Sequence, residues 1–259
     1  AGYPVYIKLE SQHGSEDPFQ DHHGSYQRPG CFISMKDLSI SIVAFNDEED
    51  VLTAVSSIEE HTPSLIAKTI YIIDNSDKPN NLSSSLAKFD DCVYMKQDKN
   101  LGFGAGHNRV LDIIDSRYHA IVNPDIILRE DAFSPLISYL DNNDAGMVAP
   151  RILDENGDLI KAYRLDPTPF DMFIRMFLKG MFKKRKAHHT MQDMDYSRPF
   201  KVPFVQGSFL VIRTDLFRKL HGFDERFFLY MEDADLCRRV NSVSTLYYCP
   251  DASVIQLWG

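Results

Sequence analysis

The chain has 259 residues, of which 44% are hydrophobic and 25% are charged, as in an ordinary globular protein. Its formal net charge of -9 and its isoelectric point of about 5.4 argue against general binding of nucleic acid. The cysteines lie far apart without metal-binding spacing, which favours a reduced, cytosolic setting. No segment has the length and hydrophobicity expected of a membrane span or a secretory signal.

Residues 1–34 differ from the rest of the chain, because His, Gly, Pro, Gln and Asp follow one another there without a sustained hydrophobic period. Met35 comes directly after them. We interpret residues 1–34 as an N-terminal extension or an artificially added segment outside the active site. For His13, His22 and His23 we favour an exposed polar tail over a metal site.

From Lys36 onward, short β-branched runs alternate with segments of helical spacing. The expected strands cover residues 38–45, 69–76, 92–97 and 118–126, and the expected helices cover residues 47–62, 82–89, 105–116 and 131–143. This alternation predicts one open, mainly parallel sheet with helices on both faces. Such a sheet binds ligands beyond the carboxyl ends of its strands. The polar residues at those ends are Asn46, Asp74, Asn100 and Asp125.

The pattern changes after Pro150. Residues 149–164 predict a hairpin that turns at Asn156 and Gly157, and an amphipathic, basic stretch follows at residues 168–189. After these come an expected strand over residues 207–213, a helix from Thr214, an acidic segment and a C-terminal strand. We therefore expect a smaller, mixed region after the parallel half of the sheet.

The loop at residues 100–108 carries glycines at positions 102, 104 and 106 between an expected strand and an expected helix. Glycines let the backbone approach a ligand closely, and the helix N-terminus that follows suits a phosphate group. A dinucleotide fingerprint is one interpretation, with Asp125 as the ribose-binding acid, but His107 stands where that fingerprint needs its third glycine. A tight strand-to-helix turn without a ligand is the other interpretation.

Asp74 and Asp125 each follow an expected strand. Asp74 has the chemistry to accept hydrogen bonds from a base or a ribose, or to serve only as a turn residue. Pro124 breaks the strand ladder and leaves Asp125 facing the cleft, where a hard divalent cation and a diphosphate would suit it. The alternative for Asp125 is an N-cap or turn residue.

Three carboxylates, Glu232, Asp233 and Asp235, crowd into four positions behind the aromatic and apolar run at residues 227–231. Like charges at this spacing repel, and burial deprives a carboxylate of its hydration. The pattern indicates either a cleft that uses negative charge, or a solvated helix in which Asp235 and Arg239 form an i,i+4 pair.

In this order and spacing, the motifs resemble the inverting glycosyltransferases of family 2, which have the GT-A fold, and especially their rhamnosyltransferase-like branch of bacterial surface polysaccharide synthesis. The motifs that carry the resemblance are SIVAFN, IIDNS, NLGFGAGHN, VNPDI, VQGSFLVIR and GFDERFFLYMEDADLCRR. It covers residues 39–259. It implies an α/β fold with one Rossmann-like, mainly parallel sheet, a nucleotide-binding half at residues 36–125 and an acceptor-binding half at residues 126–259.

By this resemblance, Asp233 is the general base that deprotonates the acceptor hydroxyl as it attacks the anomeric carbon. Asp125 is the last acid of a DxD-type motif for Mg²⁺ or Mn²⁺, and Asn123 replaces the first acid, so weak metal binding is expected. Gln256 stands where the family commonly has a histidine, and its amide oxygen is a further candidate metal ligand. The residues expected to line the nucleotide-sugar site are Asn46, Asp74, Asn100, Gly102, Asn108 and Asn123. Those expected to shape the acceptor side are Gly207, Glu232 and Asp235. The candidates for positive charge beside the leaving diphosphate are Arg151, Arg164 and His107.

The resemblance implies transfer of a sugar to a glycan or a lipid-linked acceptor, with dTDP-rhamnose as the first choice of donor and UDP-hexoses as the second. The alternatives are a noncatalytic sugar-nucleotide-binding or scaffold protein of the same fold, and a nucleotide-dependent oxidoreductase. The stretch 168–189 predicts either contact with an anionic membrane surface or a packed helix, including one in a homodimer interface. The expected location is the cytoplasm, including the inner face of the cell membrane.

Overall fold

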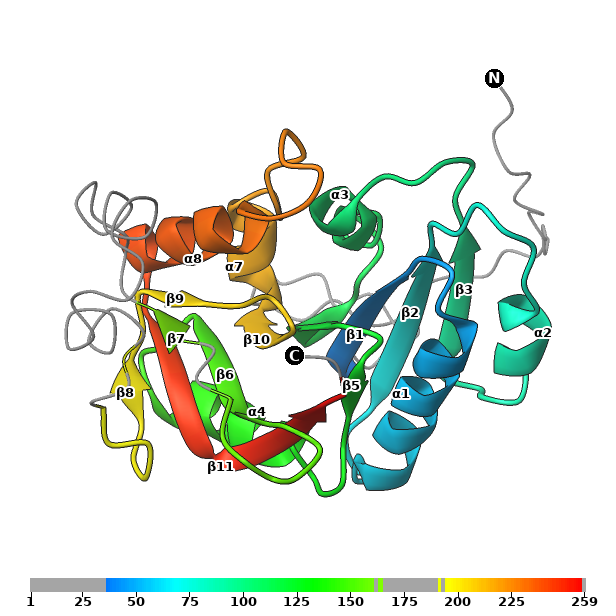
Figure 1. Ribbon diagram of the computed structural model, residues 1–259. Coiled ribbons are helices and arrows are strands. Elements are labelled where there is room, and N and C mark those ends of the chain that lie inside the picture. The colour runs from blue at the N-terminus through cyan, green and yellow to red at the C-terminus, as the bar shows by residue number, and fades with distance from the viewer. Residues whose placement is uncertain (1–35, 161–162, 165–190, 192–193, 258–259) are drawn as a thin grey trace, which may run out of the picture. The chain divides into compact units, whose positions relative to one another are not determined.

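The computed structural model describes residues 36–160, 163–164, 191 and 194–257 (Figure 1). In the first part of this region, strands alternate with helices as the hydrophobic pattern predicts. The strands are β1 (Lys36–Ala44), β2 (Lys68–Asp74), β3 (Cys92–Lys96) and β4 (Ser116–Val122). The helices are α1 (Glu48–His61), α2 (Leu82–Leu86) and α3 (Phe103–Asn108). The strands lie in the order β3-β2-β1-β4, and each neighbouring pair is parallel.

The second part adds a mixed region to the same sheet. Its strands are β5 (Ile126–Ile127), β6 (Met147–Leu153), β8 (Phe200–Lys201), β10 (Phe209–Arg213) and β11 (Leu246–Gln256), and its helices are α4 (Phe133–Asn142), α7 (Thr214–Lys219) and α8 (Glu232–Val243). β10 is antiparallel to β4 and β6, whereas β11 is parallel to β6 and antiparallel to β5 and β8. The short strands β7 (Tyr163–Arg164) and β9 (Phe204–Val205) form a separate antiparallel pair. The predicted α/β sheet, parallel first and mixed afterwards, is confirmed.

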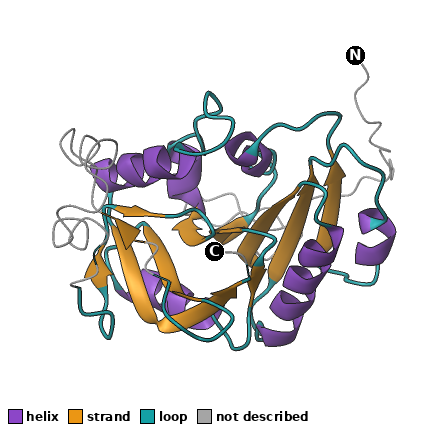
Figure 2. Ribbon diagram, in the orientation of Figure 1, coloured by secondary structure: helices purple, strands orange, loops and turns teal. Residues whose placement is uncertain are grey.

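Helices cover both faces of the sheet, as Figure 2 shows. One core cluster joins apolar side chains of α1, α2 and α4 to one face, and a second cluster joins those of α7 and α8 to the other face. Side chains of β1 alternate between the two faces of the sheet. Ile40 and Ile42 belong to the first cluster, while Ser39 and Ser41 point to the opposite face. A strand buried on both faces in this way can therefore carry a polar network on one of them.

The helix expected over residues 105–116 is much shorter in the structure. α3 ends at Asn108, and turns follow in which Leu111 N donates to Asn108 O at 3.0 Å and Ile113 N donates to Val110 O at 3.0 Å. Bonds of this i→i−3 type replace the helical ladder. The buried residues Val110 and Ile114 are still four positions apart, as in a helix. The hydrophobic spacing alone therefore did not reveal that the helix ends at Asn108.

The strand expected over residues 118–126 is also interrupted. β4 ends at Val122, because Pro124 has no N–H for a ladder, and β5 then pairs with β11 on the far side of the sheet. The predicted hairpin turn at Gly157 is present, but the strand pairing that flanks it is short. Gly157 has a φ of 85°, and Asp154 N donates to Asp158 O at 2.8 Å.

The stretch 168–189 lies outside the described residues, so its predicted membrane or packing role has no structural account here. Within the described part of the chain, every helix is too short or too polar to pass through a bilayer.

Candidate active site

The carboxyl ends of the parallel strands form the expected ligand-binding edge of the sheet. β1 and β2 end side by side, since Ala44 pairs with Asp74, and β4 lies on the other side of β1. Several polar side-chain atoms of residues near this edge are buried and have no hydrogen-bond partner. These atoms are Asn75 Oδ1, His107 Nε2, Asn123 Oδ1, Asp125 Oδ1, Ser208 Oγ and Glu232 Oε2. Each such atom costs roughly 1–3 kcal/mol when it is left without a partner, and a bound ligand is one source of the missing partners for those at the edge of the sheet.

Asp74 is fully buried at the end of β2. Its Oδ2 accepts hydrogen bonds from Tyr94 Oη at 2.6 Å and Lys96 Nζ at 3.2 Å, and its Oδ1 accepts one from Ser76 N at 2.8 Å. Burial alone would raise the pKa of Asp74, but the hydrogen bonds outweigh burial and hold this pKa well below its usual range. Asp74 is therefore a charged residue that orders the turn after β2, and its contact with a nucleotide base stays a prediction.

Asn46 joins the end of β1 to that same turn. It has a φ of 61°, its backbone N donates to Ser76 Oγ at 2.9 Å, and its side-chain Nδ2 donates to Asp77 Oδ1 at 2.8 Å. The neighbouring Asn75 donates from Nδ2 to Gly102 O at 3.1 Å and keeps a buried Oδ1 without a partner. The turn after β2 is thus connected both to β1 and to the glycine-rich loop.

The glycines of the loop face protein atoms. A Cβ placed on Gly102 would lie 2.2 Å from Phe228 O, and a Cβ on Gly106 would lie 2.8 Å from Val43 Cγ2. Asn100 closes the start of the loop, because its Oδ1 accepts a hydrogen bond from Gly102 N at 2.9 Å. The glycines are therefore required for close packing of the loop against β1 and the α7–α8 loop, which the ligand-based interpretation did not foresee.

Asn108, at the end of α3, was expected to line the nucleotide-sugar site. Its Oδ1 accepts a hydrogen bond from Phe223 N at 2.8 Å, and its Nδ2 donates to Phe223 O at 2.9 Å and to Glu225 Oε1 at 3.0 Å. The structure thus shows Asn108 joining α3 to the chain before α8. A contact of Asn108 with the donor stays a prediction.

His107 begins a buried polar chain that crosses the face of the sheet. Its Nδ1 lies 2.7 Å from Ser41 Oγ, which lies 3.0 Å from His119 Nε2, and His119 Nδ1 lies 2.7 Å from Ser39 Oγ. Burial lowers the pKa of His107 well below its ordinary value and lowers that of His119 to about 3. His107 is therefore neutral, and the prediction that it supplies positive charge to the leaving group is wrong.

Arg151, the second candidate for that positive charge, donates from Nη2 to Pro250 O at 2.8 Å. The side chain of Arg164, the third candidate, lies outside the described residues. Neither finding places a cationic side chain beside the edge of the sheet.

The residues expected to hold a metal ion lie together. Gln256 Nε2 donates to Asp125 Oδ2 at 3.0 Å, and Leu257 N donates to Asp125 O at 2.9 Å. Asp125 Oδ1 and Asn123 Oδ1 are buried without partners, and burial raises the pKa of Asp125. Gln256 thus lies beside Asp125, although it presents its amide nitrogen and not its oxygen.

These oxygen atoms fit a hard divalent cation, which prefers carboxylate and amide oxygens. They form only a partial ligand set, because the described residues contain no group of three or more His, Cys, Asp or Glu side chains able to hold a metal. Diphosphate oxygens and water would have to complete the coordination of Mg²⁺ or Mn²⁺. When bound there, such an ion would neutralise charge on the leaving diphosphate.

The first turn of α8 carries the three crowded carboxylates. Asp233 Oδ2 accepts a hydrogen bond from Gly207 N at 3.2 Å, and its Oδ1 accepts one from Ala234 N at 2.7 Å. Glu232 is 4% exposed, and burial raises its pKa. Asp235 Oδ2 lies 2.7 Å from Arg239 Nε, so the i,i+4 ion pair predicted as the alternative is present. An acceptor-binding role for Asp235 stays a prediction.

Gly207 and Ser208 connect α8 with the end of β4. Gly207 N binds Asp233, while Asn123 N donates to Ser208 O at 2.9 Å. A Cβ on Gly207 would lie only 3.2 Å from Asp233 Cβ. Asp233, the expected base, and Asn123 of the expected metal pair therefore lie next to adjacent residues of one short segment.

Sequence reasoning did not select Asn75 or Ser208. Each directly follows a selected residue, Asp74 or Gly207, and each is a small polar residue at the end of a strand. Their position next to a selected residue was the signal in the sequence that could have identified them. Whether such a side chain finds a partner depends on burial, which the sequence pattern does not report.

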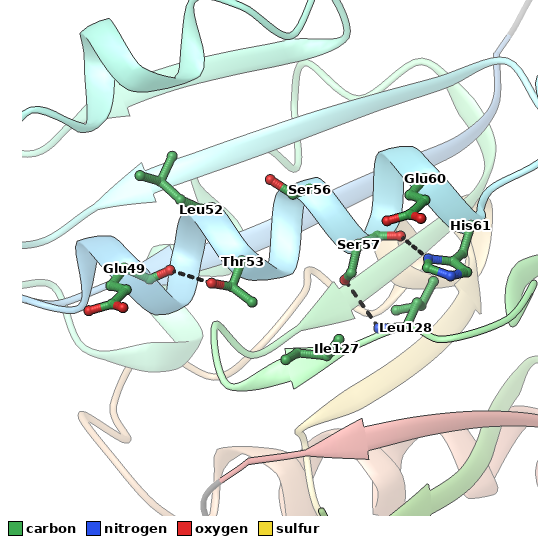
Figure 3. Close-up of a pocket in the computed structure, with 9 residues that line it drawn as sticks. All are labelled: Glu49, Leu52, Thr53, Ser56, Ser57, Glu60, His61, Ile127 and Leu128. Carbon is green, nitrogen blue, oxygen red and sulfur yellow. Dashed lines mark hydrogen bonds between the residues drawn. The ribbon is translucent and has the colours of Figure 1, made fainter.

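A groove of about 490 Å³ lies elsewhere, along α1 beside residues 127 and 128 (Figure 3). None of the predicted site residues lines it. Two of its polar side chains bond to neighbouring backbone groups, since Thr53 Oγ1 donates to Glu49 O at 2.9 Å and Leu128 N donates to Ser57 Oγ at 3.1 Å. We therefore assign the site to the edge of the sheet and not to this groove.

The fold places the chain among the GT-A proteins. It is similar to the crystal structure of GalNAc-T7 with UDP, GalNAc and Mn²⁺, with a TM-score of 0.66 and 15% sequence identity over 86% of this chain and 43% of that chain. The predicted fold is confirmed by this likeness.

The chain belongs to glycosyl transferase family 2, whose model matches residues 39–221. It is 25% identical over 202 residues to the N-acetylglucosaminyl-diphospho-decaprenol L-rhamnosyltransferase of Mycobacterium tuberculosis, covering 72% of this chain and 66% of the relative. It is 26% identical over 213 residues to the low-salt glycan biosynthesis hexosyltransferase Agl10 of Haloferax volcanii, covering 79% and 62%. With the rhamnosyltransferase WbbL of Escherichia coli it shares 27% identity over 159 residues, covering 57% and 58%. The predicted family and its rhamnosyltransferase-like character are confirmed, although the chain spans less than two thirds of the length of each relative.

Proposed function

We propose that this protein is an inverting glycosyltransferase in which Asp233 is the general base. The observation that carries the proposal is the link through residues 207 and 208, which brings Asp233 close to Asn123, two residues before Asp125. In this arrangement Asp233 takes the proton of an acceptor hydroxyl as the oxygen attacks the anomeric carbon. The nucleoside diphosphate then leaves on the side of Asn123 and Asp125.

For the donor we propose dTDP-rhamnose first and UDP-hexoses second. Two relatives are named rhamnosyltransferases and one is named a hexosyltransferase, which supports both choices. We propose a glycan or lipid-linked acceptor, and the printed name of the mycobacterial relative contains a decaprenol-linked sugar. The partial oxygen ligand set supports a weakly bound Mg²⁺ or Mn²⁺.

The proposed setting is cell-surface polysaccharide synthesis at the cytoplasmic side of a membrane. Contact of the stretch 168–189 with an anionic membrane, and a homodimer built on the same stretch, remain proposals that the described residues do not address.

The test is a comparison of Asp233→Asn with the unchanged chain. We expect Asp233→Asn to lower transfer to the acceptor by about 10²–10⁴-fold, because only the proton acceptor is lost. Binding of dTDP-rhamnose or UDP-glucose, measured by calorimetry with and without Mn²⁺, should stay the same. Asp251→Asn is the matched control, since Asp251 is an exposed carboxylate on β11.

Turnover of Asp233→Asn within about tenfold of the unchanged chain would refute the assignment of the base. Donor binding by the unchanged chain without any transfer or hydrolysis would instead favour the noncatalytic sugar-nucleotide-binding protein of the same fold.

A further inference from the structure

The loop between α7 and α8 carries a continuous run of exposed apolar side chains. Phe228, Leu229, Tyr230 and Met231 are 57%, 51%, 77% and 59% exposed. The other large apolar side chains exposed in the described part of the chain, such as Leu65 at 81%, stand singly. Single exposed apolar residues are ordinary, whereas a continuous run indicates a surface that is covered in use.

The backbone of this run is held in place at both ends. Phe228 O accepts a hydrogen bond from Phe103 N at 3.2 Å, and Met231 O accepts one from Asp235 N at 2.9 Å. Tyr230 and Met231 have φ values of 68° and 76°, a left-handed conformation that costs a residue with a side chain roughly 1–2 kcal/mol. The fold thus keeps apolar side chains exposed on a strained backbone, and strain of this kind is found at functional places.

The shape and size of the run fit a lipid surface better than a protein partner. In Figure 1 the loop projects beyond α3 and α8. Its four exposed side chains are far fewer than the about 20–30 residues that each partner contributes to a specific protein interface. A lipid surface needs no complementary shape, and tyrosine is enriched at the boundary between lipid headgroups and chains.

The charges around the loop do not form a basic patch. Arg226 Nη2 lies 2.5 Å from Asp224 Oδ2, and the exposed Glu225 and Arg238 have opposite charges. Attraction to a lipid surface would therefore come from burial of apolar side chains. It would need no anionic lipid and would persist at high salt, unlike electrostatic binding.

We propose that residues 228–231 insert into the surface of a lipid bilayer. Asp233 lies two residues beyond Met231, so insertion holds the first turn of α8 next to the lipid. Lipid binding does not depend on the proposed transferase function. Only the use of that binding, the presentation of a lipid-linked acceptor to Asp233, rests on the proposed function.

The experiment is co-sedimentation of the full chain with vesicles of phosphatidylcholine alone, in about 0.5 M NaCl to screen charge–charge attraction. The triple variant Leu229→Ser, Tyr230→Asn, Met231→Asn removes the apolar surface, and asparagine tolerates the left-handed conformation at positions 230 and 231. We expect its partition into lipid to be at least about tenfold weaker. Leu65→Ser, a similarly exposed apolar residue outside the loop, should bind as the unchanged chain does.

Leu229→Trp should strengthen the partition of the chain into lipid. The proposal is then tested by a gain of binding as well as by a loss. Equal partition of the triple variant and the unchanged chain would overturn the proposal, as would no binding of the unchanged chain to these vesicles. The unchanged chain could instead form a dimer that the triple variant abolishes while lipid binding stays the same. That result would show that residues 228–231 contact a second copy of the chain, and it would also overturn the proposal. If lipid binding behaves as expected but no nucleotide sugar is transferred or hydrolysed, only the proposed function fails.

Discussion

Gly102 provides a direct test of the contact between the glycine-rich loop and the α7–α8 loop. Gly102 has a φ of 84°, and a Cβ added there would lie 2.2 Å from Phe228 O. Gly157 has nearly the same φ, 85°, but a Cβ added there would meet nothing within 4 Å. Alanine at Gly157 carries a backbone cost of about 1–2 kcal/mol for its positive φ. Gly102 has a ψ of -178°, which with its positive φ is a conformation essentially restricted to glycine, so Gly102→Ala carries at least that backbone cost and adds a collision.

The collision involves a backbone carbonyl, so rotation of a side chain does not relieve it. Moving the backbone of Phe228 away costs about 1–3 kcal/mol more, by analogy with overpacked cores. We expect Gly102→Ala to lower the free energy of unfolding in urea by about 2–5 kcal/mol, against about 1–2 kcal/mol for Gly157→Ala. Because Phe228 leads into α8, kcat should also fall in Gly102→Ala, by about tenfold or more.

Equal losses of stability in the two variants would refute the close approach of Gly102 to Phe228. A stability loss in Gly102→Ala without any loss of kcat would show that the α7–α8 loop does not position Asp233.

Three further predictions follow from the site. Asp125→Ala should weaken binding of a nucleoside diphosphate mainly when Mn²⁺ is present, and an equal loss after chelation would remove the metal role. Gln256→His should strengthen the metal-dependent part of that affinity in calorimetry, because an imidazole nitrogen replaces an amide nitrogen beside Asp125, and no change would contradict this placement. Burial lowers the pKa of His119 to about 3 in the folded protein, below the unfolded value near 6.5. Its contribution to stability should therefore be fully present above about pH 6.5 and be lost as the pH drops toward 3, by roughly 2 kcal/mol at pH 5. His119→Gln should reduce the difference in urea midpoint between pH 7 and pH 5, and an unchanged difference would refute a neutral, buried His119.

The parallel half of the fold was predictable because its signals are local. Alternation of β-branched runs and helical spacing requires only neighbouring residues, and strand ends follow from turn residues such as Asp74 and Pro124. The gathering of Asn46, Asp74 and Asp125 at one edge then follows from parallel pairing, since parallel strands end on the same side. The pairing of Gln256 with Asp125 came from the resemblance to family 2 glycosyltransferases and not from a local pattern, and Gln256 Nε2 lies 3.0 Å from Asp125 Oδ2.

Partners of individual side chains were not predictable in the same way. One interpretation of the glycine-rich loop was close approach to a ligand, yet the backbone oxygen that lies nearest to Gly102 belongs to Phe228, 126 residues further along the chain. His107 was considered a cation, but its burial over Ser41 depends on the packing of α3 on β1. Such contacts between distant segments determine pKa and steric fit, and no local pattern reports them.

The crowded acids of α8 show how one short sequence can hold three like charges. Arg239 neutralises Asp235 by an ion pair at 2.7 Å, and burial raises the pKa of Glu232, which weakens its tendency to stay charged beside its neighbour. Asp233 is half-buried and is held by the backbone N–H groups of Gly207 and Ala234. A general base has to be both fixed in direction and reachable by the hydroxyl that it deprotonates. Among the three acids Asp233 combines these properties, because ion pairing occupies Asp235 and burial encloses Glu232.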